Sequence, residues 1–446
     1  MANRSEKGRI TLLSLSIPIV IEQVLRSLMG TINTFMLSRV SDDASAAAGV
    51  ANQALNVVIM AATMLASGTA VVINQCLGAG ETKRAARLTM NSLTVSAAVG
   101  AVPSLAALLF STPFMELVGL EAKLVPDAAA YLRIAGSACL FQFVSSMIAA
   151  HLRCRGKAQL AMISVVCNNA VNLAGSLLVV EGLLPLAGVP GIAAVRLFSE
   201  ALGLLLIAVF LFRGGWDLQV RDLVRIRMRD VRQIVKLGFQ SGLEGISYTT
   251  AQLVTTSFLT SLPAAVLSAK VYTQTVNNYA YLAGQAVGQA AQILSGQLIG
   301  AGKQEEAYRF VRKSWRLVCG CNLLFSALFF LFSGPLIGLF THSQEIQAIA
   351  RTLFLIDIFT CVGRSFNHSF NYGLRSAGYV FWPMIFANCS VWLINAGLGY
   401  VFAFPLGLGI VGVWLAQMTD EWVRGLGTAW LWLRKKWIHT AVLRND

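Results

Sequence analysis

Charged residues are scarce in this sequence of 446 residues, and acidic side chains are scarcer than basic ones. Asp, Glu, Lys and Arg together make up 13% of the chain, about half of their share in a soluble domain. Apolar runs of about 20 residues recur instead, the length that crosses a hydrocarbon core as a helix. Barrel strands, which alternate apolar and polar residues, are excluded. The composition therefore predicts an all-α integral membrane protein embedded in a lipid bilayer.

Histidine and cysteine are too few and too scattered to build a catalytic or metal site. The four histidines show neither metal-ligand spacing nor a Ser/His/Asp arrangement. The eight cysteines lie in expected helices or at their cytosolic ends, and none forms a CxxC motif. We expect no disulfide, no metal and no cofactor, and an enzyme is the least favoured functional class.

The chain contains one pattern twice. A shift of 222 positions places Glu22 on Glu244 without a gap. Other matches at this offset are Gln75/Gln297, Gly78-Ala79-Gly80/Gly300-Ala301-Gly302, Arg87/Arg309, Pro113/Pro335, Leu152-Arg153/Leu374-Arg375 and Gly156/Gly378. Because such residues are rare in so apolar a chain, their coincidence indicates a duplication.

Each copy has room for six membrane spans. We expect them near residues 12–37, 48–77, 87–111, 128–152, 158–181, 190–212, 234–261, 268–298, 314–340, 350–373, 381–404 and 410–433. The fold class is then twelve transmembrane helices in two six-helix lobes, residues 1–215 and 234–446, with a basic cytosolic linker at 216–233. An even number of spans orients both copies the same way, so a pseudo-twofold axis along the membrane normal relates them.

The net charge of +14 is a signal of topology. Most basic residues fall in the loops that share one side with both termini, including Arg4, Lys7 and Arg9 before the first span and Arg444 after the last. Basic loops stay in the cytosol, which predicts a multi-pass protein of the cell (cytoplasmic) membrane with both termini cytosolic. We expect no nucleic-acid partner and a monomer.

Glu244 is the strongest functional signal. It lies about ten residues into its span, roughly 15 Å from the cytosolic end at helical rise, and has no Lys or Arg within four positions. A carboxylate at that depth is protonated, binds a cation, or faces water or another helix. We interpret it as the coupling residue, with Lys270 and Asp357 influencing its protonation. The alternative is a structural bridge, for example to Lys270.

Other ionisable residues in the spans have potential partners nearby. Glu22 and Arg26, Arg196 and Glu200, and Asp420 and Arg424 are each four positions apart, which favours local pairs. For Glu22, a functional acid remains the alternative. Asp357 and Arg364 are two helical turns apart and could pair across a water or a substrate, or bind other helices.

Polar side chains form a stripe on span 2 and an equivalent stripe on span 8. The stripes consist of Asn52, Asn56, Thr63 and Ser67, and of Gln274, Asn278, Tyr281, Gln285, Gln289 and Gln292. Two stripes at equivalent heights favour the walls of a shared substrate cavity, with helix packing as the alternative. On span 5, Asn168 and Asn172 share a face, and they either bind a neighbouring helix or line the cavity.

These residues resemble the MATE (multidrug and toxic compound extrusion) family along essentially the whole chain. The resemblance rests on Ile17-Pro18 followed by Thr34-x-Met36, on Gln75-x-x-Gly78-Ala79-Gly80 with Ala85-Ala86, on Gln297-x-x-Gly300-Ala301-Gly302, and on Leu374-Arg375-x-x-Gly378. It implies a secondary antiporter that exports cationic, often amphipathic compounds in exchange for protons or sodium. Spans 1, 2, 7 and 8 would meet where the lobes join.

Two departures from the family pattern concern the coupling ion. Many members have Asp before Thr-x-Met, where it helps bind the cation, but this chain has Asn33. The acid that some members place eleven residues before Arg375 is Arg364 here. The resemblance therefore shifts the expected coupling site to Glu244 and favours protons over a multi-carboxylate sodium site. Replacing Glu244 with Gln is expected to abolish coupled efflux at unchanged protein levels.

Two other transport activities remain as alternatives. A sodium-coupled antiporter needs several oxygen ligands for the ion. A flippase for a lipid-linked saccharide is expected to carry basic residues in its cavity, whereas both stripes are neutral amides and hydroxyls.

Overall fold

The computed structural model describes residues 11–184 and 188–440, and within them the chain is helical without strands. Nine of its helical segments are long and apolar enough to cross a membrane. Three further helices are also long enough to cross a membrane but carry more polar residues than those nine. They are α8 (Met228–Leu259), α9 (Ala264–Gly300) and α16 (Gly409–Leu433). The predicted all-α membrane fold in two lobes is confirmed. Arg4, Lys7, Arg9 and Arg444, used to predict the orientation, lie outside the described residues.

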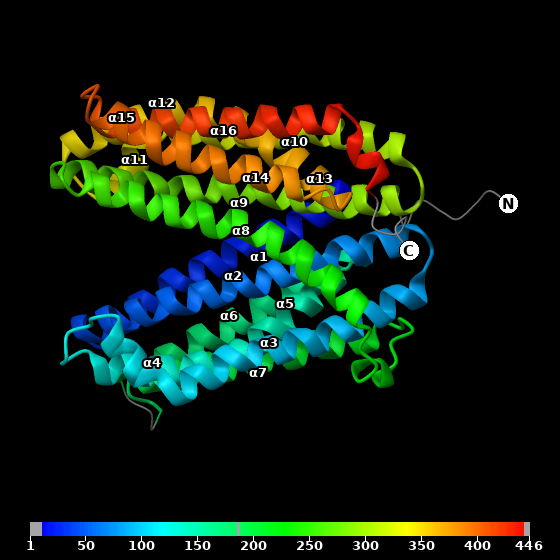
Figure 1. Ribbon diagram of the computed structural model, residues 1–446. Coiled ribbons are helices and arrows are strands. Elements are labelled where there is room, and N and C mark those ends of the chain that lie inside the picture. Colours follow the sequence, from blue (N-terminus) through cyan, green and yellow to red (C-terminus); the bar gives the residue numbers. More distant parts are fainter. Residues whose placement is uncertain (1–10, 185–187, 441–446) are drawn as a thin grey trace. The chain divides into compact units, whose positions relative to one another are not determined.

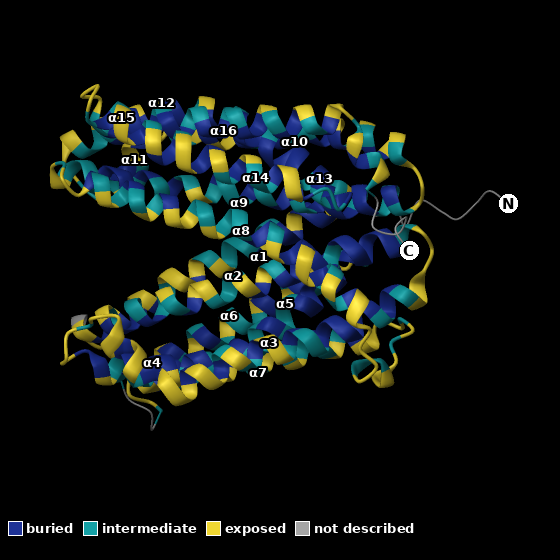
Figure 2. Cartoon of the chain, in the orientation of Figure 1, coloured by how far each residue is buried: buried dark blue, intermediate teal, exposed yellow. Residues whose placement is uncertain are grey.

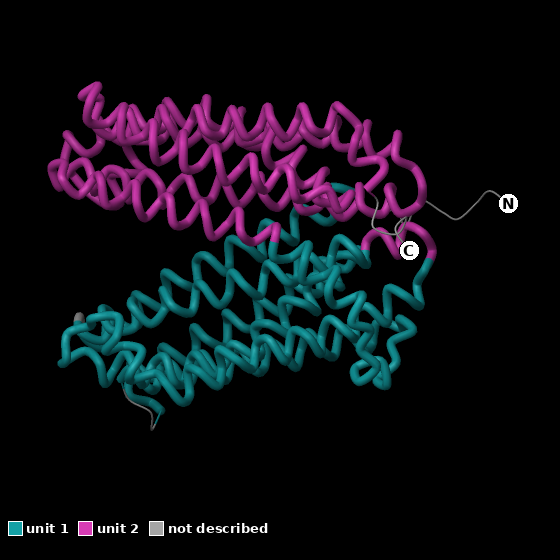
Figure 3. Tube along the Cα trace, viewed as in Figure 1, with its two compact units in different colours: residues 1–73, 81–239 teal, residues 74–80, 240–446 magenta. Residues whose placement is uncertain are grey.

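The chain divides into two compact units, coloured separately in Figure 3. Unit 1 holds residues 1–73 and 81–239, and unit 2 holds residues 74–80 and 240–446. The last turn of α2 thus packs with unit 2, and the first turns of α8 pack with unit 1. This division lies close to the predicted lobes but is not identical to them. Residues 228–233, expected in the linker, already belong to α8.

In its described residues, unit 1 contains six helical segments that run side by side, one of them made of two consecutive helices (Figure 1). They are α1 (Leu12–Ser38), α2 (Asp42–Gly78), α3 (Thr82–Leu117), α4 (Val125–Ser137) continued by α5 (Cys139–Cys154), α6 (Ala158–Val180) and α7 (Gly188–Arg213). The expected fourth span is therefore broken at Ala138. In the linker, a short 3₁₀ turn, η2 (Val220–Leu223), packs against α3, where Thr94 donates to the Leu223 carbonyl at 2.7 Å.

Unit 2 repeats this plan with more irregular helices. After α8 and α9, its elements are α10 (Gln304–Leu331), α11 (Ser333–Gly338), α12 (Gln344–Phe366), η3 (Asn367–Asn371), α13 (Tyr372–Ser376), α14 (Phe381–Ser390), η4 (Val391–Leu398), α15 (Gly399–Ala403), α16 and η5 (Lys436–His439). The segments η3 and η4 are π-helical, a form that often occurs at functional sites. They interrupt the expected spans 10 and 11.

The repeated Gln-x-x-Gly motif ends two helices and brings them together. Gly80 and Gly302 have φ of 79° and 76°, so each ends its helix in the left-handed conformation that glycine adopts without strain. Before them, a Cβ on Gly78 would lie 1.9 Å from the Gln297 carbonyl oxygen, and one on Gly300 would lie 2.0 Å from that of Gln75. The ends of α2 and α9 therefore cross through reciprocal glycine contacts, within unit 2.

The apolar side chains divide between the interior of each unit and its outer surface. Figure 2 shows buried and exposed residues alternating along individual helices. Leu109 on α3 is 70% exposed and Leu331 on α10 is 71% exposed, although both belong to spans. Such surfaces are stable against lipid chains rather than water. Polar residues inside a unit consequently need partners within it.

Candidate functional site

The interior of unit 2 contains an ion pair between Glu244 and Arg375. Glu244 lies on α8 and Arg375 on α13, and the Arg375 guanidinium approaches the carboxylate at 2.6 Å. Asn371, at the end of η3, donates to the same carboxylate at 3.0 Å. The two charged side chains are 13% and 14% exposed. The carboxylate is therefore neutralised by its own unit.

A second cluster of charges joins α12 to α16. Arg364 pairs with Glu421 at 3.3 Å, and Arg424 contacts both Asp420 at 2.7 Å and Glu421 at 3.3 Å. All four side chains are at most 7% exposed. Ser390 on α14 donates to Asp420 at 2.6 Å. The predicted local pair of Asp420 with Arg424 is present.

Each of the three buried arginines also lies against a tyrosine ring. Arg364 faces Tyr281, Arg375 faces Tyr372 and Arg424 faces Tyr248, each with its guanidinium carbon 5.6 Å from the ring centroid. Cation–π contacts of this kind stabilise a buried cation further. Tyr281, predicted to line the substrate cavity, thus packs on Arg364 and meets the His368 ring at 5.1 Å.

Asp357 on α12 has a different environment, because its partners are neutral. The Asn277 amide on α9 and the Trp414 indole on α16 both donate to Oδ2, the indole at 3.2 Å. Asp357 is 4% exposed. Of the two alternatives for Asp357 and Arg364, binding to other helices is the one present, since Arg364 binds Glu421 on α16.

Lys270 does not contact Glu244, so the alternative interpretation of Glu244 as a structural bridge applies to Arg375 and not to Lys270. Its ammonium donates to the Thr256 hydroxyl on α8, and Lys270 is 2% exposed. Of the span 8 stripe, Gln274 and Gln285 are half-buried and Asn278 is exposed. Gln285 donates to the Tyr281 hydroxyl at 3.3 Å.

In unit 1, the predicted site residues mostly bind neighbouring helices. Glu22 pairs with Arg26 at 3.3 Å as expected, and also with Arg153 on α5 at 3.4 Å. Asn172 donates to Ser199 on α7 at 3.2 Å, which fits the helix-binding alternative, and Asn168 is half-buried beside Gly203.

The polar stripe on span 2 has one residue bound to other helices, Asn52, and two exposed residues, Asn56 and Thr63. Arg196 donates to Asn52 at 2.7 Å and to Tyr131 at 2.9 Å, while Glu200 accepts from Gln142 at 3.2 Å. The expected pairing of Arg196 with Glu200 is therefore replaced by contacts between helices. Further along α2, Asn56 and Thr63 are exposed, and on α1 Asn33 is 8% exposed.

Sequence reasoning missed the residues that join separate helices. Asn277, Asn371 and Trp414 were not singled out, and Arg375 was noted as part of a motif rather than as a partner of Glu244. Asn277 does carry a weak signal, since it lies seven positions after Lys270 and therefore on the same face of α9. In the described part of the chain, no group of three or more His, Cys, Asp or Glu is placed to hold a metal.

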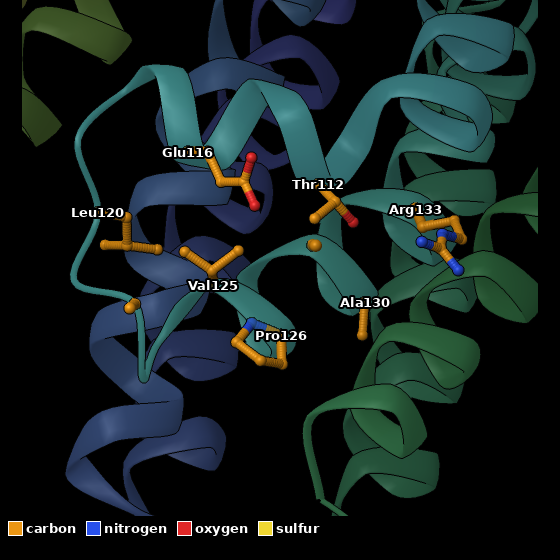
Figure 4. A pocket seen from close by; sticks show the side chains of 9 residues that line it. Thr112, Glu116, Leu120, Val125, Pro126, Ala130 and Arg133 are labelled. Atoms are coloured by element: carbon orange, nitrogen blue, oxygen red, sulfur yellow. The ribbon is translucent and has the colours of Figure 1, made fainter.

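A cavity of about 580 Å³ opens in unit 1 where α3 leads into α4. Figure 4 shows Glu116 on α3 and Arg133 on α4 lining it, with Thr112 between them and Val125 and Pro126 lower in the view. None of the residues predicted for coupling or for the substrate cavity belongs to its lining.

Comparisons with known proteins agree with the two-unit helical architecture. The MatE family model matches residues 18–178 and 241–401. The "Uncharacterized transporter YisQ" of Bacillus subtilis is 34% identical over 431 residues, covering 96% of this chain and 95% of that protein. The "Probable multidrug resistance protein NorM" of Thermotoga maritima is 26% identical, covering 98% and 95%. A solved "multidrug resistance MATE family transporter of the MOP superfamily" superposes with a TM-score of 0.86 at 21% identity, covering 96% of each chain.

Proposed function

Starting from the fact that this chain belongs to the MatE family of membrane transporters, we propose that it exports cationic or amphipathic small molecules by secondary antiport. Protons entering the cell supply the free energy in this proposal. The observation that carries it is the family match over both halves of the chain. Relatives named as multidrug resistance proteins along nearly the whole length add support.

The proposed mechanism is alternating access. The two homologous lobes rock against each other, so that a site between them opens to one side of the membrane at a time. Antiport requires that the coupling ion and the substrate stabilise different states, because a ligand shifts an equilibrium only by its differential affinity. A buried carboxylate meets this need, since it favours one state when ionised and another when neutralised. We propose that the acidic residues of unit 2, Glu244 and Asp357, provide the coupling group.

Membrane orientation and oligomeric state belong to the same proposal. The chain is a multi-pass membrane protein, and its basic loops support placement in the cytoplasmic membrane with both termini in the cytosol. A monomer with no nucleic-acid partner and no cofactor is sufficient for this mechanism. Single-cysteine variants carrying Asp217→Cys or Lys435→Cys test the orientation when a thiol reagent is added to one side of the membrane. We expect both positions to be labelled from the cytosolic side.

The decisive experiment measures transport of a fluorescent organic cation in everted membrane vesicles. Proton and sodium gradients are imposed separately, and vesicles lacking the protein serve as the control. Uptake driven by an acid interior alone supports proton antiport, whereas uptake driven by sodium alone selects the sodium-coupled alternative. If neither gradient drives uptake of several cations, antiport of this substrate class is refuted. Transport of an anionic lipid-linked saccharide would then select the flippase.

A further inference from the structure

The linker, residues 216–233, presents basic side chains that the rest of the chain does not neutralise. It contains five arginines and three aspartates, and one of these aspartates, Asp230, is buried. Arg221, Arg225 and Arg227 are exposed, and none of the three forms a salt bridge within residues 11–184 and 188–440. Their charge is therefore accessible to a partner outside the described chain.

Large apolar side chains of the linker are exposed beside these arginines. Val224 is 85% exposed, Ile226 is 42% exposed and Met228 is 73% exposed. They alternate in sequence with Arg225 and Arg227, so each exposed apolar side chain has a guanidinium group next to it along the chain. Water does not suit the apolar part of such a surface, and hydrocarbon does not suit the charged part. The boundary between lipid and water suits both.

Hydrogen bonds hold the linker backbone against the side of α3. Thr94 donates to the Leu223 carbonyl at 2.7 Å. Asn91 is fully buried, and in the amide orientation that satisfies both of its ends it donates to the carbonyls of Asp222 and Arg225 at 2.6 and 3.2 Å. The exposed side chains consequently project from an ordered backbone, which lowers the entropy cost of binding a ligand.

A ring contact attaches the first part of the linker to α5. The Trp216 ring meets the His151 ring edge-on at 5.2 Å, and the Arg155 guanidinium lies 5.7 Å from the centre of the Trp216 ring. Figure 1 shows the green segment between α7 and α8 folded back beside these helices. The linker is thus part of the packed surface of unit 1.

The residues that hold the linker lie where α3 enters the membrane. The 36 residues of α3 span roughly 54 Å at helical rise, more than the hydrocarbon core of about 30 Å. Asn91 and Thr94 lie within two turns of the predominantly apolar stretch of α3, residues 97–110. The linker therefore lies at the level of the lipid headgroups.

Other loops at the same end of unit 1 do not combine these features. Residues 79–81 connect α2 to α3 and residues 155–157 connect α5 to α6, and neither loop contains a large apolar residue. A basic loop that only sets membrane topology requires positive charge alone. The exposed apolar residues and the ordered backbone of the linker need a further explanation.

We propose that the linker is a binding site for anionic phospholipids of the adjoining leaflet. Val224, Ile226 and Met228 enter the boundary between headgroups and acyl chains, and the three exposed arginines bind phosphate oxygens. Guanidinium groups bind phosphate in a bidentate manner, and each basic residue close to an anionic membrane surface strengthens binding severalfold. An RNA or an acidic protein would satisfy the arginines but leave the apolar side chains in water. The inference goes beyond the proposed antiport and is independent of the transported compound.

The test identifies the lipid that touches the linker. The full chain, with the photo-crosslinker benzoylphenylalanine in place of Val224, is reconstituted in nanodiscs of equal parts phosphatidylglycerol and phosphatidylcholine with identical acyl chains. Mass spectrometry then measures the two lipid adducts, and phosphatidylglycerol adducts are expected to exceed phosphatidylcholine adducts at least threefold. The matched control carries the crosslinker in place of Leu109, which is 70% exposed on α3, and should form both adducts equally.

Two sets of substitutions test the role of charge. Removing the three exposed arginines is expected to lower the adduct ratio to about one and to weaken phosphatidylglycerol binding in detergent at least tenfold. The control removes the same charge from the exposed surface of α10 and should leave both measurements unchanged. The first set is Arg221→Gln, Arg225→Gln and Arg227→Gln, and the control set is Arg309→Gln, Arg312→Gln and Arg316→Gln.

The outcomes are decisive without any transport measurement. Lipid adducts at position 109 but none at position 224 would show that the linker lies away from lipid, which overturns the proposal. Equal amounts of the two adducts at position 224 would overturn selection of anionic lipid, and an adduct with co-purified RNA or protein would select that partner instead. If the arginine variant does not fold, the adduct ratio at position 224 in the otherwise unchanged chain still decides. Failure of antiport leaves this inference standing, because its readout is lipid contact.

Discussion

Removing the charge of Glu244 should destabilise the protein because it leaves Arg375 buried without a counter-ion. The Glu244–Arg375 contact is 2.6 Å long and both side chains are about one-eighth exposed. Removing one partner of a buried pair costs about 3–5 kcal/mol, and because both groups are partly exposed we expect a cost of about 3 kcal/mol for Glu244→Gln. At roughly 2–4 °C per kcal/mol, the melting temperature should fall by on the order of 6–12 °C.

This expectation differs from the one based on sequence, in which Glu244→Gln left protein levels unchanged. The double variant Glu244→Gln with Arg375→Gln should recover most of the loss, because no isolated charge then remains and two amides can bond to each other. The resulting interaction energy should be about 2 kcal/mol in a double-mutant cycle. Thermal unfolding in detergent is measured for the wild type, both single variants and the double variant. Tryptophan fluorescence follows unfolding, and size-exclusion chromatography measures how much folded protein remains.

The matched control is a pair of similar length on the surface. Lys435 and Glu305 approach to 2.8 Å, but their side chains are 41% and 54% exposed. Water and salt screen such a pair, so Glu305→Gln should leave the melting temperature unchanged. A Glu244→Gln protein that melts with the wild type would refute the reasoning, since it would show that Arg375 needs no counter-ion in its position.

Two further predictions concern packing within unit 2. Gly300→Ala should lower stability by about 1–3 kcal/mol, because its Cβ would lie 2.0 Å from the Gln75 carbonyl oxygen and one helix must move; Gly320→Ala, with no atom within 4 Å of the new Cβ, should not destabilise. Trp437→Ala should cost about 3–5 kcal/mol, since Trp437 is fully buried and stacks on Trp432 at 4.1 Å. Unchanged thermal unfolding of either variant would contradict the corresponding contact.

The sequence determined whatever depends on the chain's local period or on its duplication. Apolar runs fixed the helical spans because lipid leaves the backbone no alternative partner. The expected ends of spans 2 and 8, at residues 77 and 298, lie within two residues of the ends of α2 and α9. The pairs Glu22–Arg26 and Asp420–Arg424 were predictable because residues four apart on one helix are always neighbours.

Only the tertiary structure decided which side chains meet across helices. Glu244 and Arg375 are 131 positions apart, and Asp357 and Asn277 are 80 apart. No periodicity in the sequence links such residues, because their meeting depends on how each helix is rotated and which neighbour it packs against. Arg196 and Glu200 are the converse case, in which a contact that the sequence predicted is absent. Their spacing permits a pair, yet packing offers Arg196 the Asn52 and Tyr131 oxygens instead. Helical geometry sets the contacts within a helix, and packing sets those that neutralise buried charge.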